Sequence, residues 1–299
     1  MDTVLKIDNL TKHYGRITAV KNLSLEVQRG NVFGILGPNG SGKTTTLGIL
    51  LDVINKTSGT FSWFGLPPGK EVRKKIGAIL ETPIFYPYLS AVKNLEIVAE
   101  IKGAPIENID RVLQKVELYE RRFDKFRTYS LGMKQRLSIA SALLCDPEVM
   151  ILDEPTNGLD PQGIAEIREL IRQIAKEGKT IILASHLLDE VQKVCTHFCV
   201  LKRGTLLYSG SVEDVNKGVE SVEVMSDAQD FRGVLEAYSK ASKVVEDSGK
   251  FVVTLADGTH ASDLNAYLFS KGITISHLLT QRKSLEKQFL ELLAESDNA

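Results

Sequence analysis

The residues best suited to chemistry form a short run near the N-terminal end that combines glycines, a lysine and two threonines. The spacing G-x-x-x-x-G-K-[ST] is matched by Gly37-Pro38-Asn39-Gly40-Ser41-Gly42-Lys43-Thr44-Thr45. Glycines let consecutive backbone N–H groups turn inward around a phosphate without a Cβ in the way. Lys43 can reach the β- and γ-phosphates of a nucleotide, and the Thr44 hydroxyl can bind Mg²⁺. The run therefore predicts a binding site for a nucleoside triphosphate with Mg²⁺.

The elements on either side of this run are those that a phosphate loop needs. An apolar strand, Val32 to Leu36, leads into it, and an apolar helix, Thr44 to Val53, leads out of it. The positive end of the helix dipole then faces the bound phosphates. A glycine-rich turn that ends in Lys-Thr by chance is the alternative, and the strand and helix together argue against it.

Two adjacent carboxylates form the second chemical group. Asp153 and Glu154 follow the apolar run Val149 to Leu152, and open α/β sheets bind their ligands at the carboxyl ends of such strands. Asp153 can hold Mg²⁺ through water, and Glu154 can orient and polarise the attacking water. Acid pairs after apolar strands are common, but this pair comes 110 residues after Lys43, a position that strengthens the prediction.

The order of apolar segments predicts the fold that positions these residues. Strands alternate with helices over residues 1–217, and a helical insertion covers about residues 85–145. This alternation is typical of an α/β domain with a mostly parallel sheet. Residues 218–299 are predicted to form a small C-terminal accessory α+β domain, similar to a ferredoxin-like fold. Its predicted elements include a helix from Phe231 to Ala241, a strand from Ile273 to Leu278 and a helix from Leu285 to Leu293.

The composition excludes several classes of protein. The 299 residues include 37 basic and 38 acidic residues, so the net charge is −1 and no global field favours nucleic acid. Three cysteines are too few for a disulfide framework. No apolar run approaches the ~18–20 residues that span a bilayer. If the protein acts at a membrane, another subunit must therefore supply the spanning helices.

A third segment resembles a known motif. The segment reads Tyr129-Ser130-Leu131-Gly132-Met133-Lys134-Gln135-Arg136. It resembles the signature motif L-S-G-G-Q-[KR]-Q-R of ATP-binding cassette (ABC) proteins. With the phosphate loop and the acid pair in the family's order and spacing, the chain resembles the nucleotide-binding subunit of an ABC transporter. Ser130 and Gly132 are kept, whereas Leu131 and Met133 stand where glycine and glutamine are usual. The resemblance implies that Ser130 caps a helix facing the γ-phosphate bound by a second subunit; a capping serine without further role is the alternative.

The resemblance assigns roles to three further positions. Gly158-Leu159-Asp160 resembles the D-loop, which couples the two sites of a dimer; a plain Asp-Pro turn that starts a helix is the alternative. His186, which follows the predicted strand Thr180 to Ala184, resembles the switch histidine that contacts the γ-phosphate. Tyr14 resembles the aromatic residue that stacks on adenine. An ordinary histidine at a strand end and an ordinary surface tyrosine are the alternatives.

One position departs from the family pattern in a way that narrows the subclass. Glu81 stands where the family has a glutamine that touches Mg²⁺ and relays the state of the site to the helical insertion. A carboxylate is a good ligand for Mg²⁺, but it adds a negative charge beside Asp153 and Glu154. The pattern Glu-x-Pro-x-Phe-Tyr-Pro that starts at Glu81 resembles exporters that confer self-protection against bacitracin or lantibiotics.

The resemblance implies an ATPase, with ATP and Mg²⁺, that powers an exporter of antimicrobial peptides, drugs or lipid-like substrates. It implies a P-loop ABC ATPase domain with an antiparallel β subdomain, a homodimer that closes head to tail on ATP, and polytopic membrane permease subunits as partners. The chain is then expected in the cytoplasm, peripheral at the inner face of the cell membrane, with no nucleic acid partner. A regulator of a membrane complex in cell division or motility would carry the same catalytic residues and stays open. The lack of a long heptad insertion and of a basic tract argues against DNA repair.

Overall fold

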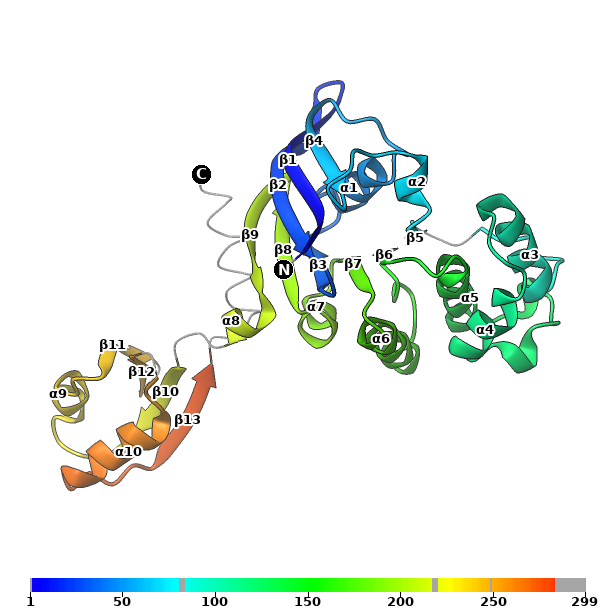
Figure 1. Cartoon of the computed structure of the whole chain (residues 1–299). Helices are drawn as coiled ribbons and strands as arrows, with labels where there is room; N and C mark the ends of the chain where they lie inside the picture. The colour runs from blue at the N-terminus through cyan, green and yellow to red at the C-terminus, as the bar shows by residue number, and fades with distance from the viewer. Residues whose placement is uncertain (1, 81–83, 217–219, 248, 257, 283–299) are drawn as a thin grey trace. The chain divides into compact units, whose positions relative to one another are not determined.

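The chain folds into two compact units, Met1–Val212 and Glu213–Ala299. The sequence predicts a domain boundary a few residues later, between residues 217 and 218. The computed structural model describes residues 2–80, 84–216, 220–247, 249–256 and 258–282 (Figure 1). Glu81 and the predicted last helix, Leu285 to Leu293, lie outside the described residues.

The centre of the first unit is a six-stranded sheet with the strand order β5-β6-β7-β3-β8-β9. Neighbouring strands from β5 to β8 are parallel, and β9 is antiparallel to β8. Every residue of β3, β6 and β7 is buried, which is why these strands read as continuous apolar runs in the sequence. The strands are β3 (Val32–Leu36), β5 (Ile76–Ile79), β6 (Val149–Asp153), β7 (Thr180–Ser185), β8 (His197–Lys202) and β9 (Thr205–Ser211). The α/β prediction is confirmed.

Helices follow three of these strands, β3, β6 and β7, at their carboxyl ends. The helix α1 (Lys43–Leu50) follows β3, α6 (Pro161–Lys176) connects β6 to β7, and α7 (Leu188–Val194) connects β7 to β8. Asp160 caps α6, and Pro161 lies in the first turn of this helix, where the backbone N–H that proline lacks would have no partner within the helix. The short helices are α2 (Lys70–Arg73) and α8 (Val212–Asn216).

A three-stranded antiparallel sheet, in the order β2-β1-β4, shares one apolar core with the six-stranded sheet. Its strands are β1 (Thr3–Tyr14), β2 (Ile17–Gln28) and β4 (Ser58–Trp63). Buried and exposed side chains alternate from Leu23 to Val27 in β2, the pattern of a sheet with one solvated face. Irregular pairing interrupts this alternation in β1, where the neighbours Val4 and Leu5 are both buried. The predicted antiparallel β subdomain is confirmed.

Three helices form a group beside the sheet (Figure 1). They are α3 (Ala91–Lys102), α4 (Asn108–Lys115) and α5 (Leu131–Leu143), with 3₁₀ turns at Tyr119–Arg121 and Phe126–Thr128. They pack on one another, and α5 also packs on β5. In the described part of the chain, no helix is both long and apolar enough to cross a bilayer.

Between residues 220 and 282, the described part of the second unit forms a four-stranded antiparallel sheet in the order β11-β12-β10-β13 with two helices. Its elements are β10 (Glu220–Met225), α9 (Phe231–Glu236), β11 (Ala241–Asp247), β12 (Lys250–Leu255), α10 (Ala261–Ser270) and β13 (His277–Arg282). Val222, Val224 and Val253 from the sheet pack with Leu264 and Leu268 from α10. The predicted α+β fold is confirmed, with the βαββαβ order of a ferredoxin-like fold.

Two predicted elements of this unit have wrong boundaries. The helix predicted to reach Ala241 ends at Glu236, because Ala241 pairs with Leu255 at the start of β11. The strand predicted over Ile273 to Leu278 begins only at His277, which pairs with Met225. In both cases cross-strand pairing, which single-sequence periodicity does not contain, determines the boundary.

Candidate functional site

The phosphate loop is held between β3 and α1 by contacts with its neighbours. The Gly37 N–H donates to the Ser185 carbonyl at 3.3 Å, and the Gly204 N–H donates to the Ser41 carbonyl at 2.9 Å. Gly42 has φ +103°, and a Cβ there would lie 2.4 Å from the Ala19 carbonyl oxygen. Only glycine fits this position, because another residue would combine left-handed backbone strain with a backbone clash.

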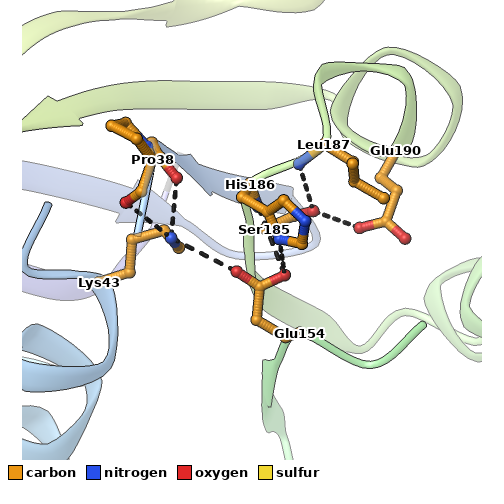
Figure 2. A network of polar contacts seen from close by, with 8 residues as sticks. Pro38, Lys43, Glu154, Ser185, His186, Leu187 and Glu190 are labelled. Atoms are coloured by element: carbon orange, nitrogen blue, oxygen red, sulfur yellow. Dashed lines mark hydrogen bonds and ion pairs between the residues drawn. The ribbon is translucent and has the colours of Figure 1, made fainter. Parts of the chain in front are cut away.

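Lys43 is the first residue of α1 and is buried, with 5% of its side chain exposed. Its Nζ donates to the Gly37 carbonyl at 2.8 Å and to the Pro38 carbonyl at 3.3 Å. It also pairs with Glu154 Oε1 at 3.4 Å (Figure 2). The ammonium group therefore lies inside the loop, between two carbonyl oxygens and a carboxylate.

Glu154 lies immediately after β6 with φ +48°, and its N–H donates to the Ala184 carbonyl at 2.9 Å. Its second carboxylate oxygen, Oε2, lies 2.8 Å from His186 Nδ1 and 3.4 Å from the backbone nitrogen of His186. Lys43, Glu154 and His186 come from separate segments, and the sequence predicted all three as site residues. The carboxylate of Glu154 joins them (Figure 2).

The predicted metal ligands have the chemistry that Mg²⁺ requires. Asp153 is the last residue of β6 and is 3% exposed, and Thr44 is exposed in the first turn of α1. Carboxylate and hydroxyl oxygens are suitable donors for this hard cation. The third predicted ligand, Glu81, falls outside the described residues.

The signature segment and the D-loop begin two helices and lie side by side. Ser130 caps α5 by accepting the Met133 N–H at 3.3 Å, and Asp160 caps α6 by accepting the Gly163 N–H at 3.0 Å. A surface pocket of about 410 Å³ lies between them. Its lining includes Ser130, Leu131, Gly132 and Met133 from the signature segment and Gly158, Leu159 and Asp160 from the D-loop.

Contacts join the signature helix both to the D-loop and to the helix that follows it. The Leu131 side chain lies against Gly158, 3.2 Å from the position that a Cβ would take. Arg136 pairs with Glu166 on α6 at 3.0 Å and with Glu117 at 2.9 Å. The Arg136 guanidinium holds the pKa of the Glu166 carboxyl below its usual range. Neither Lys43 nor Glu154 lines this pocket, so one chain presents two separate groups of predicted site residues.

Tyr14 ends β1 and is 45% exposed. The Lys12 ammonium lies 4.7 Å from the centroid of its ring, within the range of a cation–π contact. The same hairpin passes the phosphate loop at Ala19, which approaches Gly42. An exposed ring on this hairpin is available for stacking on a planar base.

Sequence reasoning missed two polar residues behind His186, namely Ser185 and Glu190. Ser185 donates its hydroxyl to Glu190 Oε2 and accepts the Leu187 N–H at 3.0 Å (Figure 2). Glu190 is 1% exposed. The sequence signal that could have indicated Glu190 is its place four residues after His186, on a short helix that also carries the apolar residues Val191 and Val194.

Comparisons with known proteins show which family and which relatives this chain resembles. The family model described as "ABC transporter" matches residues 20–157. The chain is 38% identical to the bacitracin transport ATP-binding protein BcrA of Bacillus licheniformis, over 98% of this chain and 98% of that protein. It is 41% identical to the lantibiotic transport ATP-binding protein SrtF of Streptococcus pyogenes, over 70% of this chain and 93% of that protein.

A solved structure shows the same fold for the first unit. It is the dimeric structure of a post-hydrolysis state of the ATP-binding cassette MJ0796 bound to ADP and phosphate. It matches with a TM-score of 0.61 and 28% identity, over 70% of this chain and 98% of that chain. On the fold, the site geometry and these similarities, the chain belongs to the ATP-binding proteins of the ABC transporter family.

Proposed function

We propose that this ATPase powers the export of an antimicrobial peptide, drug or lipid-like molecule through a membrane permease. The observation that carries the proposal is the convergence of Lys43, at 3.4 Å, and His186, at 2.8 Å, on the carboxylate of Glu154. The relatives' names, which refer to bacitracin and lantibiotic transport, support a peptide substrate. They also favour transport over a regulatory scaffold.

Each of the three residues has a distinct proposed task. Lys43 neutralises charge on the β- and γ-phosphates, with the loop N–H groups around it. Glu154 accepts a proton from the attacking water and orients it toward the γ-phosphate. His186 donates to a γ-phosphate oxygen and is held in position by Glu154. Catalysis then rests on positioning and charge neutralisation rather than on a covalent intermediate.

Thr44 and Asp153 are the residues that would hold Mg²⁺, with Glu81 as a further ligand. When bound, the ion neutralises phosphate charge. Tyr14 would stack on the adenine, a contact worth about 1–3 kcal/mol by analogy with other base–aromatic pairs.

A homodimer is the proposed active form, because the two groups of site residues within one chain are separate and would complete one another only across two chains. Lys43, Glu154 and His186 form one group, whereas Ser130 to Met133 and the D-loop line the other pocket. In a head-to-tail dimer, the helix N-terminus behind Ser130 would face the γ-phosphate held by the partner's phosphate loop. The similar cassette MJ0796, whose structure with ADP and phosphate is dimeric, supports this arrangement.

The proposed permease contact is the exposed apolar segment at the start of the helical insertion. Ile84 is 98% exposed, Tyr86 50% and Tyr88 64%. Such a cluster of exposed apolar and aromatic side chains is typical of a protein interface. The protein would therefore act in the cytoplasm, at the inner face of the membrane that holds its permease.

Complementation between two inactive variants tests the dimer. Lys43→Ala removes the phosphate contact and Ser130→Arg fills the signature pocket, so each variant alone should lack ATPase activity. In a mixture, half of the dimers pair one variant with the other, and each such dimer keeps one complete site. We expect recovery of roughly one quarter of the wild-type rate if the two sites act independently. Recovery of no activity would contradict a shared site.

Transport is tested in inverted membrane vesicles that contain the chain together with its membrane-spanning partner. ATP should drive labelled bacitracin or a lantibiotic into the vesicles, and either peptide should stimulate phosphate release. Vesicles with the Lys43→Ala variant are the control. If ATP turnover responds to neither peptide and no uptake occurs, the peptide-export proposal is wrong, although the ATPase assignment stands.

A further inference from the structure

Ser185 touches both the phosphate loop and the turn that carries His186. It is the last residue of β7 and is fully buried. Its carbonyl accepts the Gly37 N–H at 3.3 Å, and its hydroxyl oxygen accepts the Leu187 N–H at 3.0 Å. The same hydroxyl donates to Glu190 Oε2 (Figure 2). The Ser185 hydroxyl therefore links the buried Glu190 carboxylate to the backbone just after His186.

Glu190 lies in an environment that is unfavourable for a carboxylate. It is 1% exposed on α7, and among the described residues its Oε1 has no hydrogen-bond partner. Burial raises the pKa of its carboxyl, while the hydrogen bond from Ser185 and the nearby Arg168 charge act in the opposite direction. The Arg168 guanidinium pairs with Asp189 at 2.9 Å. An apolar side chain of similar size would be cheaper to bury here, which argues for a role other than stability.

We propose that Glu190 is a positioning residue for ATP hydrolysis. Its carboxylate orients the Ser185 hydroxyl, which holds the Leu187 N–H and with it the turn that places His186 against Glu154. The inference rests on the proposed role of His186 at the γ-phosphate. Glu190 itself does not touch nucleotide; it acts through Ser185 and His186.

The test compares two substitutions at this position. Glu190→Met fills the space with an apolar, flexible chain and removes the acceptor, whereas Glu190→Gln keeps an acceptor oxygen for Ser185. We expect Glu190→Met to lower kcat about 10- to 100-fold, with the KM for ATP within about twofold and a melting temperature equal to or above that of the wild type. Glu190→Gln should recover kcat to within about threefold of the wild type.

Asp189→Ala is the matched control. It removes a carboxylate of the same helix, one that pairs with Arg168 and Lys193. Among the described residues, the Ser185 hydroxyl bonds to Glu190 and Leu187 rather than to Asp189. It should leave kcat near the wild-type value. If Glu190→Met does not fold, Ser185→Ala removes the same hydrogen bond from the other side and should give the same fall in kcat.

A double variant separates this inference from the proposed function. If Glu190 acts through His186, then His186→Ala with Glu190→Met should be no slower than His186→Ala alone. Wild-type kcat in Glu190→Met, a Gln variant as slow as the Met variant, or additive losses would overturn the inference and leave the role of His186 intact. Wild-type kcat in His186→Ala would overturn the role of His186 and the inference with it.

Discussion

Replacing Glu154 by glutamine is the most informative single change, because it should move binding and catalysis in opposite directions. The carboxylate of Glu154 lies 3.4 Å from Lys43 Nζ and 2.8 Å from His186 Nδ1. Glutamine keeps the size of the side chain and one acceptor oxygen but removes the negative charge. The Lys43 ammonium then loses its paired negative charge, keeps the Gly37 and Pro38 carbonyls as acceptors, and becomes more available to phosphates.

The size of the effect on binding follows from the ion pair. At 3.4 Å and an effective dielectric constant of about 20, two unit charges interact by roughly 5 kcal/mol. Solvent reaches Glu154, whose side chain is 21% exposed, so the net change is much smaller. We expect ATP to bind more tightly by about 1.4 kcal/mol, which is about tenfold in Kd.

The effect on catalysis has the opposite sign. Loss of the general base should lower kcat by a factor of about 10² to 10⁴. Because ATP binds but is not hydrolysed, the variant should also accumulate as a dimer with ATP and Mg²⁺.

Three measurements check this prediction. Calorimetry gives the Kd for ATP, phosphate release gives kcat, and size-exclusion chromatography with ATP detects the dimer. Glu148→Gln is the control, since it removes a carboxylate that pairs with Arg29 and Lys75 away from the site. A wild-type rate in Glu154→Gln would refute its role as the base. Weaker ATP binding would refute the argument from the Lys43 ion pair.

Three further predictions concern the phosphate loop and the helical insertion. Lys43→Ala should abolish ATP binding in calorimetry, and normal affinity would contradict the phosphate-loop assignment. Gly42→Ala should lower the melting temperature and the ATP affinity, because its Cβ would meet the Ala19 carbonyl at 2.4 Å; Gly40→Ala, with φ +78° but open space around the Cβ, should cost less. Burial raises the pKa of Tyr129 to about 12 from 10.0, and its hydroxyl donates to the Arg121 carbonyl at 2.7 Å. This stabilisation is complete below pH 10 and is lost as the pH rises to about 12. In urea unfolding, the wild type should therefore lose more stability between pH 8 and pH 11 than the Tyr129→Phe variant does. An equal loss in the two proteins would contradict the prediction.

The sequence alone determined those features that depend on neighbouring residues. The phosphate loop is one contiguous run, and its glycines, Lys43 and Thr44 carry the prediction without any knowledge of the rest of the fold. Likewise, the buried strands of the central sheet read as apolar runs because both of their faces are covered. The caps of α5 and α6 could be read from Ser130 and Asp160, since capping joins residues three positions apart.

Only the tertiary structure decided which distant residues meet. The contact of Glu154 with both Lys43 and His186 depends on the strand order β6-β7-β3, which brings the ends of three strands to one edge of the sheet. The buried bond between Ser185 and Glu190 had no sequence signal strong enough to find it, because a carboxylate on a surface-type helix usually faces solvent. The boundaries of α9 and β13 were likewise set by pairing with strands elsewhere in the chain. Local chemistry acts over a few residues, whereas strand pairing and burial act between segments whose separation in sequence carries no information about their distance in space.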